Sequence, residues 1–152
     1  MDSRPARGTA LRPGGTAVRV RRVEYFYVTV KDEPGAAFQI LSQLAGLGVN
    51  LLGFTAVPVG PSRAQLTLFP EDSGTLRHAA AQARLVLDGP HPALLVQGDD
   101  ELGALADLHQ RLFAAGVDVY ASSGVTDGRG AFGYVVYVRE DQIGQAATAL
   151  GV

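Results

Sequence analysis

The sequence predicts an α+β protein made of two copies of one βαββα module. The first observation behind this prediction is an internal repeat, because a shift of 68 positions places residues 17–84 over 85–152 without a gap. The second is that both copies show the same order of strand and helix patterns. The third is that residues 17–21 alternate apolar and basic side chains before the first module begins, as an edge strand does.

The repeated positions are those at which the secondary structure changes. Asp32-Glu33-Pro34-Gly35-Ala36 falls on Asp100-Glu101-Leu102-Gly103-Ala104, and Gly48-Val49 falls on Gly116-Val117. A period this long indicates paired domains rather than a solenoid, which stacks shorter units in larger numbers. The function of the protein is therefore expected to be that of the module.

Each copy predicts the same elements in turn. In the first copy, aromatic and β-branched residues predict a strand at 23–30, and an apolar stripe predicts a helix that follows Gly35 and ends at Gly48. Strands at 50–58 and 63–69 and a helix at 73–83 follow. The second copy predicts a strand at 93–98, a helix that carries Leu105 and Leu112, strands at 117–125 and 131–138, and a helix at 141–150.

A ferredoxin-like βαββαβ sandwich needs one more strand in each copy. We expect an exchange of edge strands, in which 17–21 completes the second copy and 85–87 completes the first. The alternative is that the second copy lacks its edge strand. The fold class predicted is thus two ferredoxin-like βαββαβ repeats with antiparallel sheets and helices on one face of each. The domains expected are 16–88 and 89–152.

The composition excludes several classes of protein. Cysteine is absent, which excludes a disulfide framework, a thiolate metal site and a cysteine nucleophile. No apolar run approaches the roughly 20 residues of a membrane span, and the N-terminal residues lack the apolar core of a secretory signal. We therefore expect a cytoplasmic protein that does not associate with membranes.

The charge is unevenly distributed. Six of the thirteen basic residues lie before residue 23, and residues 23–152 hold seven basic and fourteen acidic residues, a net charge of minus seven. Because phosphate binding needs a positive field, this body is not expected to bind nucleic acid. Residues 1–15 are rich in Arg, Gly and Pro, and we expect a disordered leader. Contact with nucleic acid or an acidic partner is its alternative role.

The first copy resembles the ACT domain, the small-molecule-sensing module of amino-acid metabolism. The residues that carry the resemblance form an Asp-x-Pro-Gly turn, a helix with a Leu-Gly end and a Val-Asn-Leu start of the next strand; they are Asp32, Pro34, Gly35, Ile40, Leu41, Leu44, Leu47, Gly48, Val49, Asn50 and Leu51. The second copy matches more loosely. The resemblance implies a tandem ACT protein that binds an amino acid beside the first loop.

The chemistry of this loop agrees with that implication. At a helix start the first N–H groups lack intrahelical partners, so Gly35, Ala36 and Ala37 can donate to a ligand carboxylate. Asp32, with Glu33 and Pro34 in the same loop, could hold the ammonium group. Asn50, with Leu51 beside it, could supply a donor and an acceptor from across a domain interface. The structural alternative is that Asp32 or Glu33 caps the helix and Gly35 only permits the turn.

The corresponding residues of the second copy are Asp100, Gly103, Ala104 and Asp118. Here Leu102 replaces the proline, and three successive acids at 99–101 would repel a ligand carboxylate. We therefore expect the first loop to be the better site. The acids could hold a divalent cation, but a solvated acidic helix cap is the favoured interpretation, and no metal or cofactor is expected.

No catalytic motif stands out in the sequence. The three histidines lack the spacing of metal ligands, and His109 occupies a helix position expected for a half-buried packing residue. The function predicted is a non-enzymatic regulatory protein that senses a small amino acid and reports it to a metabolic enzyme or regulator, as a homodimer. The alternative is a ligand-free interaction module or regulatory subunit.

Overall fold

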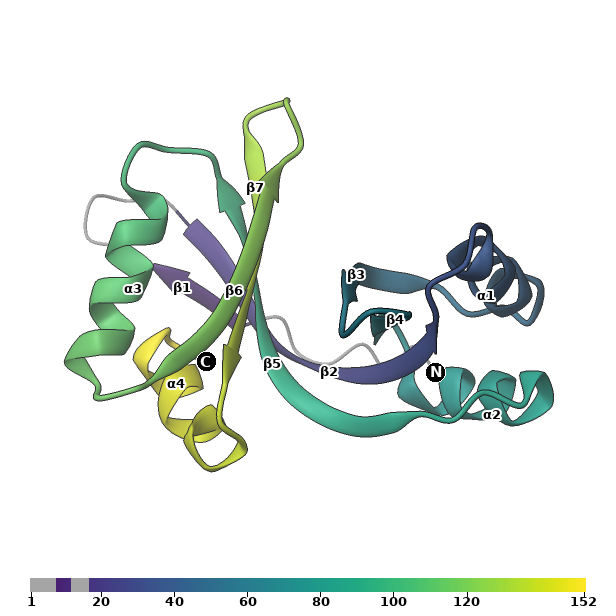
Figure 1. Ribbon diagram of the computed structural model, residues 1–152. Helices are drawn as coiled ribbons and strands as arrows, with labels where there is room; N and C mark the ends of the chain where they lie inside the picture. The colour runs from purple at the N-terminus through teal and green to yellow at the C-terminus, as the bar shows by residue number, and fades with distance from the viewer. Residues whose placement is uncertain (1–7, 12–16) are drawn as a thin grey trace. The chain divides into compact units, whose positions relative to one another are not determined.

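The computed structural model describes residues 8–11 and 17–152 and divides the chain into two units. The first-repeat unit comprises Glu24–His91, and the second-repeat unit comprises Pro92–Val152 together with the chain up to Val23. Figure 1 shows two long strands, β2 (Ala17–Lys31) and β5 (Asp88–Asp99), that run through both units. Each of these strands therefore contributes one part of its length to each unit.

The strands form one seven-stranded sheet in the order β3-β4-β2-β5-β7-β6, with β1 paired to β2. Each unit combines two helices with its own part of this sheet: β3-β4-β2-β5, called the first-repeat sheet, and β1-β2-β5-β7-β6, called the second-repeat sheet. The remaining elements are β1 (Gly8–Leu11), α1 (Ala36–Gly46), β3 (Leu51–Pro58), β4 (Arg63–Pro70), α2 (Ser73–Ala83), α3 (Ala104–Ala114), β6 (Val119–Thr126), β7 (Ala131–Val138), a 3-10 turn at Glu140–Gln142 and α4 (Ile143–Ala149). The predicted pair of βαββαβ repeats is confirmed. None of the described helices is long and apolar enough to cross a membrane.

The 68-residue repeat of the sequence is also a repeat of the strand register. Thr29 of β2 pairs with Gln65 of β4, and Gln97 of β5 pairs with Gly133 of β7. The irregularity after Leu51 in β3 recurs after Val119 in β6. The two copies therefore share one backbone plan, and differences between them lie in their side chains.

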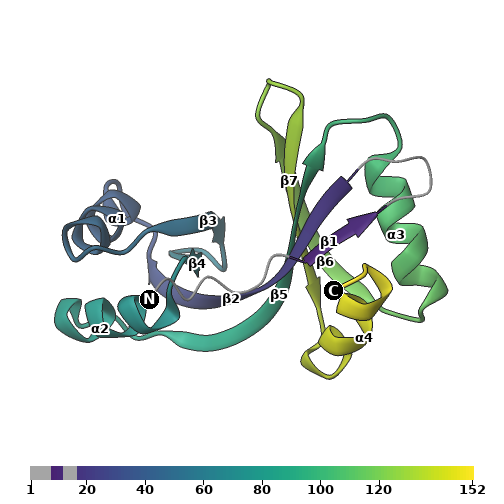
Figure 2. The same ribbon diagram turned by 180° about the vertical axis from the view of Figure 1, so that it is seen from behind.

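One face of each sheet packs against the helices of its own unit, as Figure 2 shows from behind. The first-repeat core joins Phe26 and Leu68 of the sheet to Leu44 of α1 and Leu76 of α2. The second-repeat core is built in the same way; its members are Val18, Val20, Leu94, Val96, Leu108, Leu112, Val117, Tyr134, Val136, Val138, Ala146, Ala147 and Leu150. Two residues of β2 that precede the first module thus lie in the core of the second.

This placement confirms the expected exchange for residues 17–21. A Cβ built on Gly98 of β5 would lie 2.6 Å from Cγ1 of Val18, so the two strands are in close contact in the second-repeat unit. In the first-repeat unit, a Cβ on Gly89 would lie 2.8 Å from the carbonyl oxygen of Tyr25. The units differ from the contiguous domains expected at 16–88 and 89–152, because 17–23 belongs to the second-repeat unit and 89–91 to the first.

The expected strand at 85–87 is wrong, because β5 begins at Asp88. The backbone N–H of Leu85 donates to the carbonyl oxygen of Ala80 (2.9 Å), next to Arg84 in the left-handed conformation. This bond closes the C-terminus of α2 at Leu85, so the chain joins the sheet only three residues later, at Asp88. Leu85 and Leu87 still pack against the first-repeat core.

The expectation of a disordered leader at 1–15 falls largely outside the described residues. Gly8–Leu11, which are described, form β1 and differ from that expectation. They pair antiparallel with Ala17–Val20 at the edge of the second-repeat sheet. The physical reason is that an edge strand leaves a row of N–H and C=O groups unpaired, and β1 pairs one such row of β2.

The exchange predicts where a core mutation acts. Val20 is 1% exposed in the second-repeat core, so Val20→Ala should lower the free energy of unfolding by about 2 kcal/mol. Hydrogen exchange should then show lost protection in β7 rather than in β4, although Val20 lies closer in sequence to the first module. The exposed neighbour Arg19→Ala is the control. Equal loss of protection in β4 would contradict the assignment.

A second prediction follows from the cap of α2. The Asp72 carboxylate accepts hydrogen bonds from the Thr75 N–H (2.8 Å) and the Thr75 hydroxyl (3.1 Å), and these bonds lower the pKa of Asp72. Stability from a carboxyl with a lowered native pKa is present above the unfolded pKa and is lost as pH falls through the native pKa. Asp72→Ala should therefore be less stable at pH 7, with a difference that shrinks on acidification.

Denaturant unfolding of both proteins between pH 7 and pH 2 measures this difference. Asp72→Asn is the matched control, because an amide oxygen can still accept the helix N–H bond but does not titrate. A gap between wild type and Asp72→Ala that stays constant over the whole pH range would rule out the carboxylate as its source.

Candidate functional site

Two equivalent loops begin the helices α1 and α3 with a glycine in the left-handed conformation. The φ angle is 85° at Gly35 and 82° at Gly103. Side chains are strained in this region, whereas glycine adopts it freely. A Cβ built on either glycine would meet no atom within 4 Å. The backbone conformation, rather than crowding, therefore requires glycine at these two positions.

The glycines leave the first turn of each helix without a side-chain cap. The N–H of Ala36 donates to the carbonyl oxygen of Glu33 (3.2 Å), and that of Ala104 to the carbonyl oxygen of Glu101 (3.1 Å). The next N–H groups of each helix have no intrahelical acceptor and lie at the positive end of the helix dipole. Each helix start can thus donate to an anionic group such as a carboxylate.

A backbone hydrogen bond ties each loop to the turn of the following hairpin. The N–H of Asp32 donates to the carbonyl oxygen of Ser62 (2.9 Å), and that of Asp100 donates to the carbonyl oxygen of Gly130 (2.8 Å). The start of α1 therefore lies beside the β3–β4 turn, and the start of α3 beside the β6–β7 turn. This neighbourhood is the same in both units.

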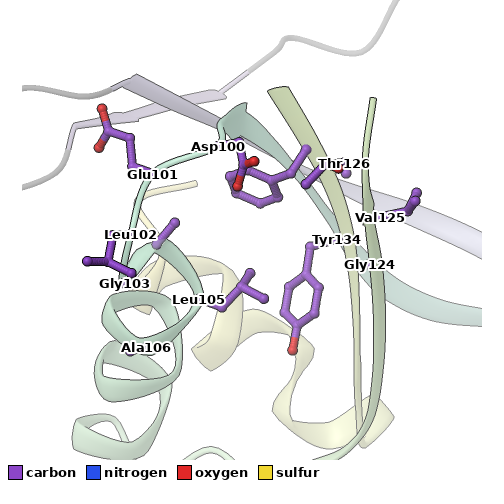
Figure 3. A pocket seen from close by; sticks show the side chains of 13 residues that line it. Asp100, Glu101, Leu102, Gly103, Leu105, Ala106, Gly124, Val125, Thr126 and Tyr134 are labelled. Atoms are coloured by element: carbon purple, nitrogen blue, oxygen red, sulfur yellow. The ribbon is translucent and has the colours of Figure 1, made fainter. Parts of the chain in front are cut away.

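The larger pocket at these loops belongs to the second-repeat unit. It has a volume of about 590 Å³ and lies between the loop before α3 and the strands β6 and β7, as Figure 3 shows. The lining residues are Asp100, Glu101, Leu102, Gly103, Ala104, Leu105, Ala106, Gly124, Val125, Thr126, Phe132, Gly133 and Tyr134. Small-molecule sites commonly span about 300–1,000 Å³. We call this space the α3 pocket.

The pocket at the first loop lies beside the end of β2 and the β3–β4 turn, and not at the helix start. It has a volume of about 500 Å³ and is lined by Thr29, Val30, Lys31, Asp32, Glu33, Ser62 and Arg63. Gly35, Ala36 and Ala37, which were expected to bind a carboxylate, are not part of its lining, and Pro34 is exposed. Of the second-copy residues, Asp100, Gly103 and Ala104 all line the α3 pocket.

The remaining expected site residues lie at the other end of their helices. The side-chain amide of Asn50 donates to Oε2 of Glu71 (2.8 Å), and Leu51 packs against the first-repeat core. Asp118 lies 3.8 Å from Nη2 of Arg139. An 11-residue helix, such as α1 or α3, is about 16 Å long, so neither Asn50 nor Asp118 reaches the helix start within its own unit.

His109 is half-buried and reaches the α3 pocket through a tyrosine. Its Nε2 lies 2.6 Å from the hydroxyl oxygen of Tyr134, whose side chain lines the pocket and is 6% exposed. The other histidines lie elsewhere: Nε2 of His78 is 3.1 Å from Nε2 of Gln82, and Nε2 of His91 is 3.1 Å from Oδ1 of Asp88. Within residues 8–11 and 17–152, no group of three or more His, Asp or Glu side chains could hold a metal ion.

Sequence reasoning missed the strand residues that line the α3 pocket. Leu105 was assigned only to an apolar stripe, and Phe132 and Tyr134 only to a strand. A position-by-position comparison of the repeats contains a signal, because the first copy has Ala37, Ala64 and Leu66 at these places. A side chain that is larger in one copy of a duplicated module than at the equivalent position of the other is a candidate for a role specific to that copy.

Comparisons with known proteins agree with this fold. No protein-family model and no curated protein matches the chain. A solved structure from Bacteroides thetaiotaomicron covers 85% of this chain and 88% of its own, at 14% identity and a TM-score of 0.72. The regulatory subunit of aspartate kinase from Thermus thermophilus, in a ligand-free form, covers 88% and 93%, at 14% identity and a TM-score of 0.62.

The fold is that of tandem ACT domains. The aspartokinase alpha and beta subunits give a further match, with a TM-score of 0.59 at 16% identity over 88% of this chain and 93% of that one. The resemblance of the sequence to ACT domains is therefore confirmed at the level of the fold. The left-handed glycines of the α1 and α3 loops occupy corresponding positions in the two repeats of this chain.

Proposed function

We propose that this protein is a non-enzymatic regulator that binds an amino acid in the α3 pocket and reports it to a metabolic enzyme or regulator. The α3 pocket is the observation that carries the proposal. It joins an uncapped helix start, an acidic loop and an apolar wall in one space of about 590 Å³. These three features match the carboxylate, ammonium group and side chain of an amino acid.

Each group of the ligand has a proposed partner. The N–H groups of Leu105 and Ala106, in the first turn of α3, donate to the carboxylate. The side chain of Asp100 accepts from the ammonium group. The ligand side chain lies against Leu105 and Tyr134, which extend into the space between α3 and the strands in Figure 3.

The solved structures support the regulatory part of the proposal. Two of them are regulatory subunits of aspartate kinase, from Thermus thermophilus and Thermus flavus. From them we propose for this chain a regulatory role and an enzyme as partner, and we do not propose which enzyme it is. The first loop, with Asp32, Glu33 and Gly35, is the better site in the sequence analysis; we propose it instead as a second and weaker site, because its pocket does not extend to the helix start.

A ligand-free interaction module is the second candidate function. The observation that favours it is the outer strand β6, which has only β7 as a neighbour in the described sheet and is exposed at residues 120–126. Such an edge can pair with a strand of another chain. Ligand binding separates the two functions, because a ligand that binds only the folded state raises its apparent stability.

A matched pair of glycine variants tests the site. A thermal-shift screen of the twenty amino acids should find one that stabilises the wild type, by about 2.7 kcal/mol at a concentration of 100 times the dissociation constant. Gly103→Val should abolish this stabilisation, because a branched side chain at the helix start blocks the approach of a carboxylate. Gly35→Val introduces the same left-handed strain at the other loop and should retain it.

The outcomes of this screen are distinct. Loss of stabilisation in Gly35→Val alone would move the site to the first loop. If no amino acid stabilises the wild type, the interaction module becomes the better function.

Assembly provides a separate prediction. We expect a homodimer that pairs exposed sheet edges, with Asn50 or Asp118 of one chain supplied to a helix start of the other. Light scattering at tens of micromolar should give twice the mass of the chain. The N–H of Asp127 donates to the carbonyl oxygen of Ala131 of β7, so the alternate residues of β6, Ser122 among them, direct their N–H groups to the open edge. Ser122→Pro, in the exposed part of β6, should shift the mass toward the monomer, because proline removes a donor from that edge. Ser122→Ala, which keeps the N–H group, is the control. A strict monomer with and without amino acids would contradict this assembly.

A further inference from the structure

The second repeat differs from the first at two cross-strand pairs beside the α3 pocket. Tyr134 of β7 pairs with Gly124 of β6, and Phe132 of β7 pairs with Gly98 of β5. The corresponding pairs of the first repeat are Leu66 with Ala56 and Ala64 with Val30. In both pairs, an aromatic residue faces a glycine where the first repeat has two aliphatic side chains.

Gly124 makes room for an aromatic ring, because a Cβ built on it would lie 2.6 Å from Cδ2 of Tyr134 and 3.0 Å from the backbone oxygen of Gly133. At Gly98 a Cβ would clash with Val18, at 2.6 Å from its Cγ1, and would lie in ordinary contact, 3.4 Å, with Cε1 of Phe132. Each ring therefore lies over the backbone of its neighbouring strand, the arrangement by which an aromatic residue covers a cross-strand glycine. Both aromatic residues line the α3 pocket.

Two further contacts complete an apolar wall. The hydroxyl of Tyr134 is 2.6 Å from Nε2 of His109, which holds the ring in one position. Across the pocket, the side chain of Leu105 is 41% exposed and lines the same space. Leu105, Phe132 and Tyr134 thus give one pocket three large apolar side chains, which we call the aromatic wall.

The charged groups of the pocket are all of one sign. Asp100 and Glu101 lie in its loop, and no basic side chain is among the described residues that line it. A second carboxylate on a ligand would lie close to the Asp100 carboxylate and be repelled by it. Acidic ligands are therefore disfavoured, whereas an uncharged side chain can lie against the aromatic wall.

We propose that the α3 pocket selects amino acids with a large apolar side chain, aliphatic or aromatic, over small and acidic ones, through the aromatic wall. This specificity rests on the proposed function. The gain from the wall comes from apolar surface removed from water and from contact with the rings. In this proposal, the aromatic–glycine pairs of the second repeat position the two rings so that they face the ligand.

Isothermal titration of the full chain with L-phenylalanine, L-leucine, L-alanine, L-lysine and L-aspartate tests the order of affinities. L-Phenylalanine or L-leucine should bind at least about tenfold more tightly than L-alanine, since a few methylene groups in an apolar site give discrimination of this size. L-Aspartate should bind more weakly than L-alanine, because its second carboxylate is repelled by the acidic loop. Tightest binding of L-lysine or L-aspartate would overturn the specificity.

Leu105→Ala places the first-repeat residue of position 37 in the wall. Because Leu105 is partly exposed, the fold should tolerate the change, and affinity for L-leucine should fall by about tenfold while that for L-alanine changes by less than about twofold. Phe113→Ala, on the same helix but 83% exposed and outside the pocket, is the matched control. An equal loss for L-leucine and L-alanine in Leu105→Ala would contradict the wall.

A double variant tests the aromatic–glycine pair itself. Gly124→Ala alone should lower the melting temperature, because the new Cβ meets the ring of Tyr134. Adding Tyr134→Leu imports the complete first-repeat pair and should restore the melting temperature while selectivity for L-phenylalanine over L-alanine is lost. Selectivity that survives in the stable double variant would overturn the proposal.

Failure of the specificity and failure of the proposed function give different results. If no amino acid binds the wild type, the proposed function fails. If amino acids bind but show no preference for large apolar side chains, only the specificity fails.

Discussion

The burial of Val18 and Val20 in the second-repeat core is the contact on which the rest of the structure depends. A βαββα module has helices enough to cover four strands but supplies only three, so one apolar edge of its core stays open. Strand β2 closes this edge in the second-repeat unit with residues that precede the first module. The start of β5 does the same for the first-repeat unit. The second repeat is therefore completed by a segment that directly precedes the first module in sequence, and the first repeat by a segment that directly precedes the second.

A shared backbone plan then fixes the ends of both helices. The loops before α1 and α3 turn through a left-handed glycine, and a backbone bond from Asp32 or Asp100 ties each loop to the following hairpin. These bonds use main-chain atoms, so they survive changes of side chain between the repeats. The duplication therefore preserves two equivalent helix starts without a side-chain cap, while it leaves the surrounding side chains free to diverge.

The divergence has produced two different surroundings for the same geometry. In the second repeat, Tyr134 and Phe132 lie over Gly124 and Gly98, and an apolar wall faces the start of α3. In the first repeat, smaller side chains occupy these positions, and the pocket lies at Asp32 instead of at the helix start. Under the proposed function, the second repeat binds the ligand tightly and the first supports the fold.

The sequence by itself determined the duplication, the order of elements and the exchanged strand at 17–21, because these depend on apolar periodicity and on glycine at fixed offsets. It also identified the two loops, since a left-handed helix start leaves a glycine in each copy. Only the tertiary structure decided that β5 begins at Asp88, where the closure of α2 ends. It alone brought Leu105 and Tyr134 together, because the walls of a pocket come from a helix and strands whose contact depends on packing rather than on local pattern.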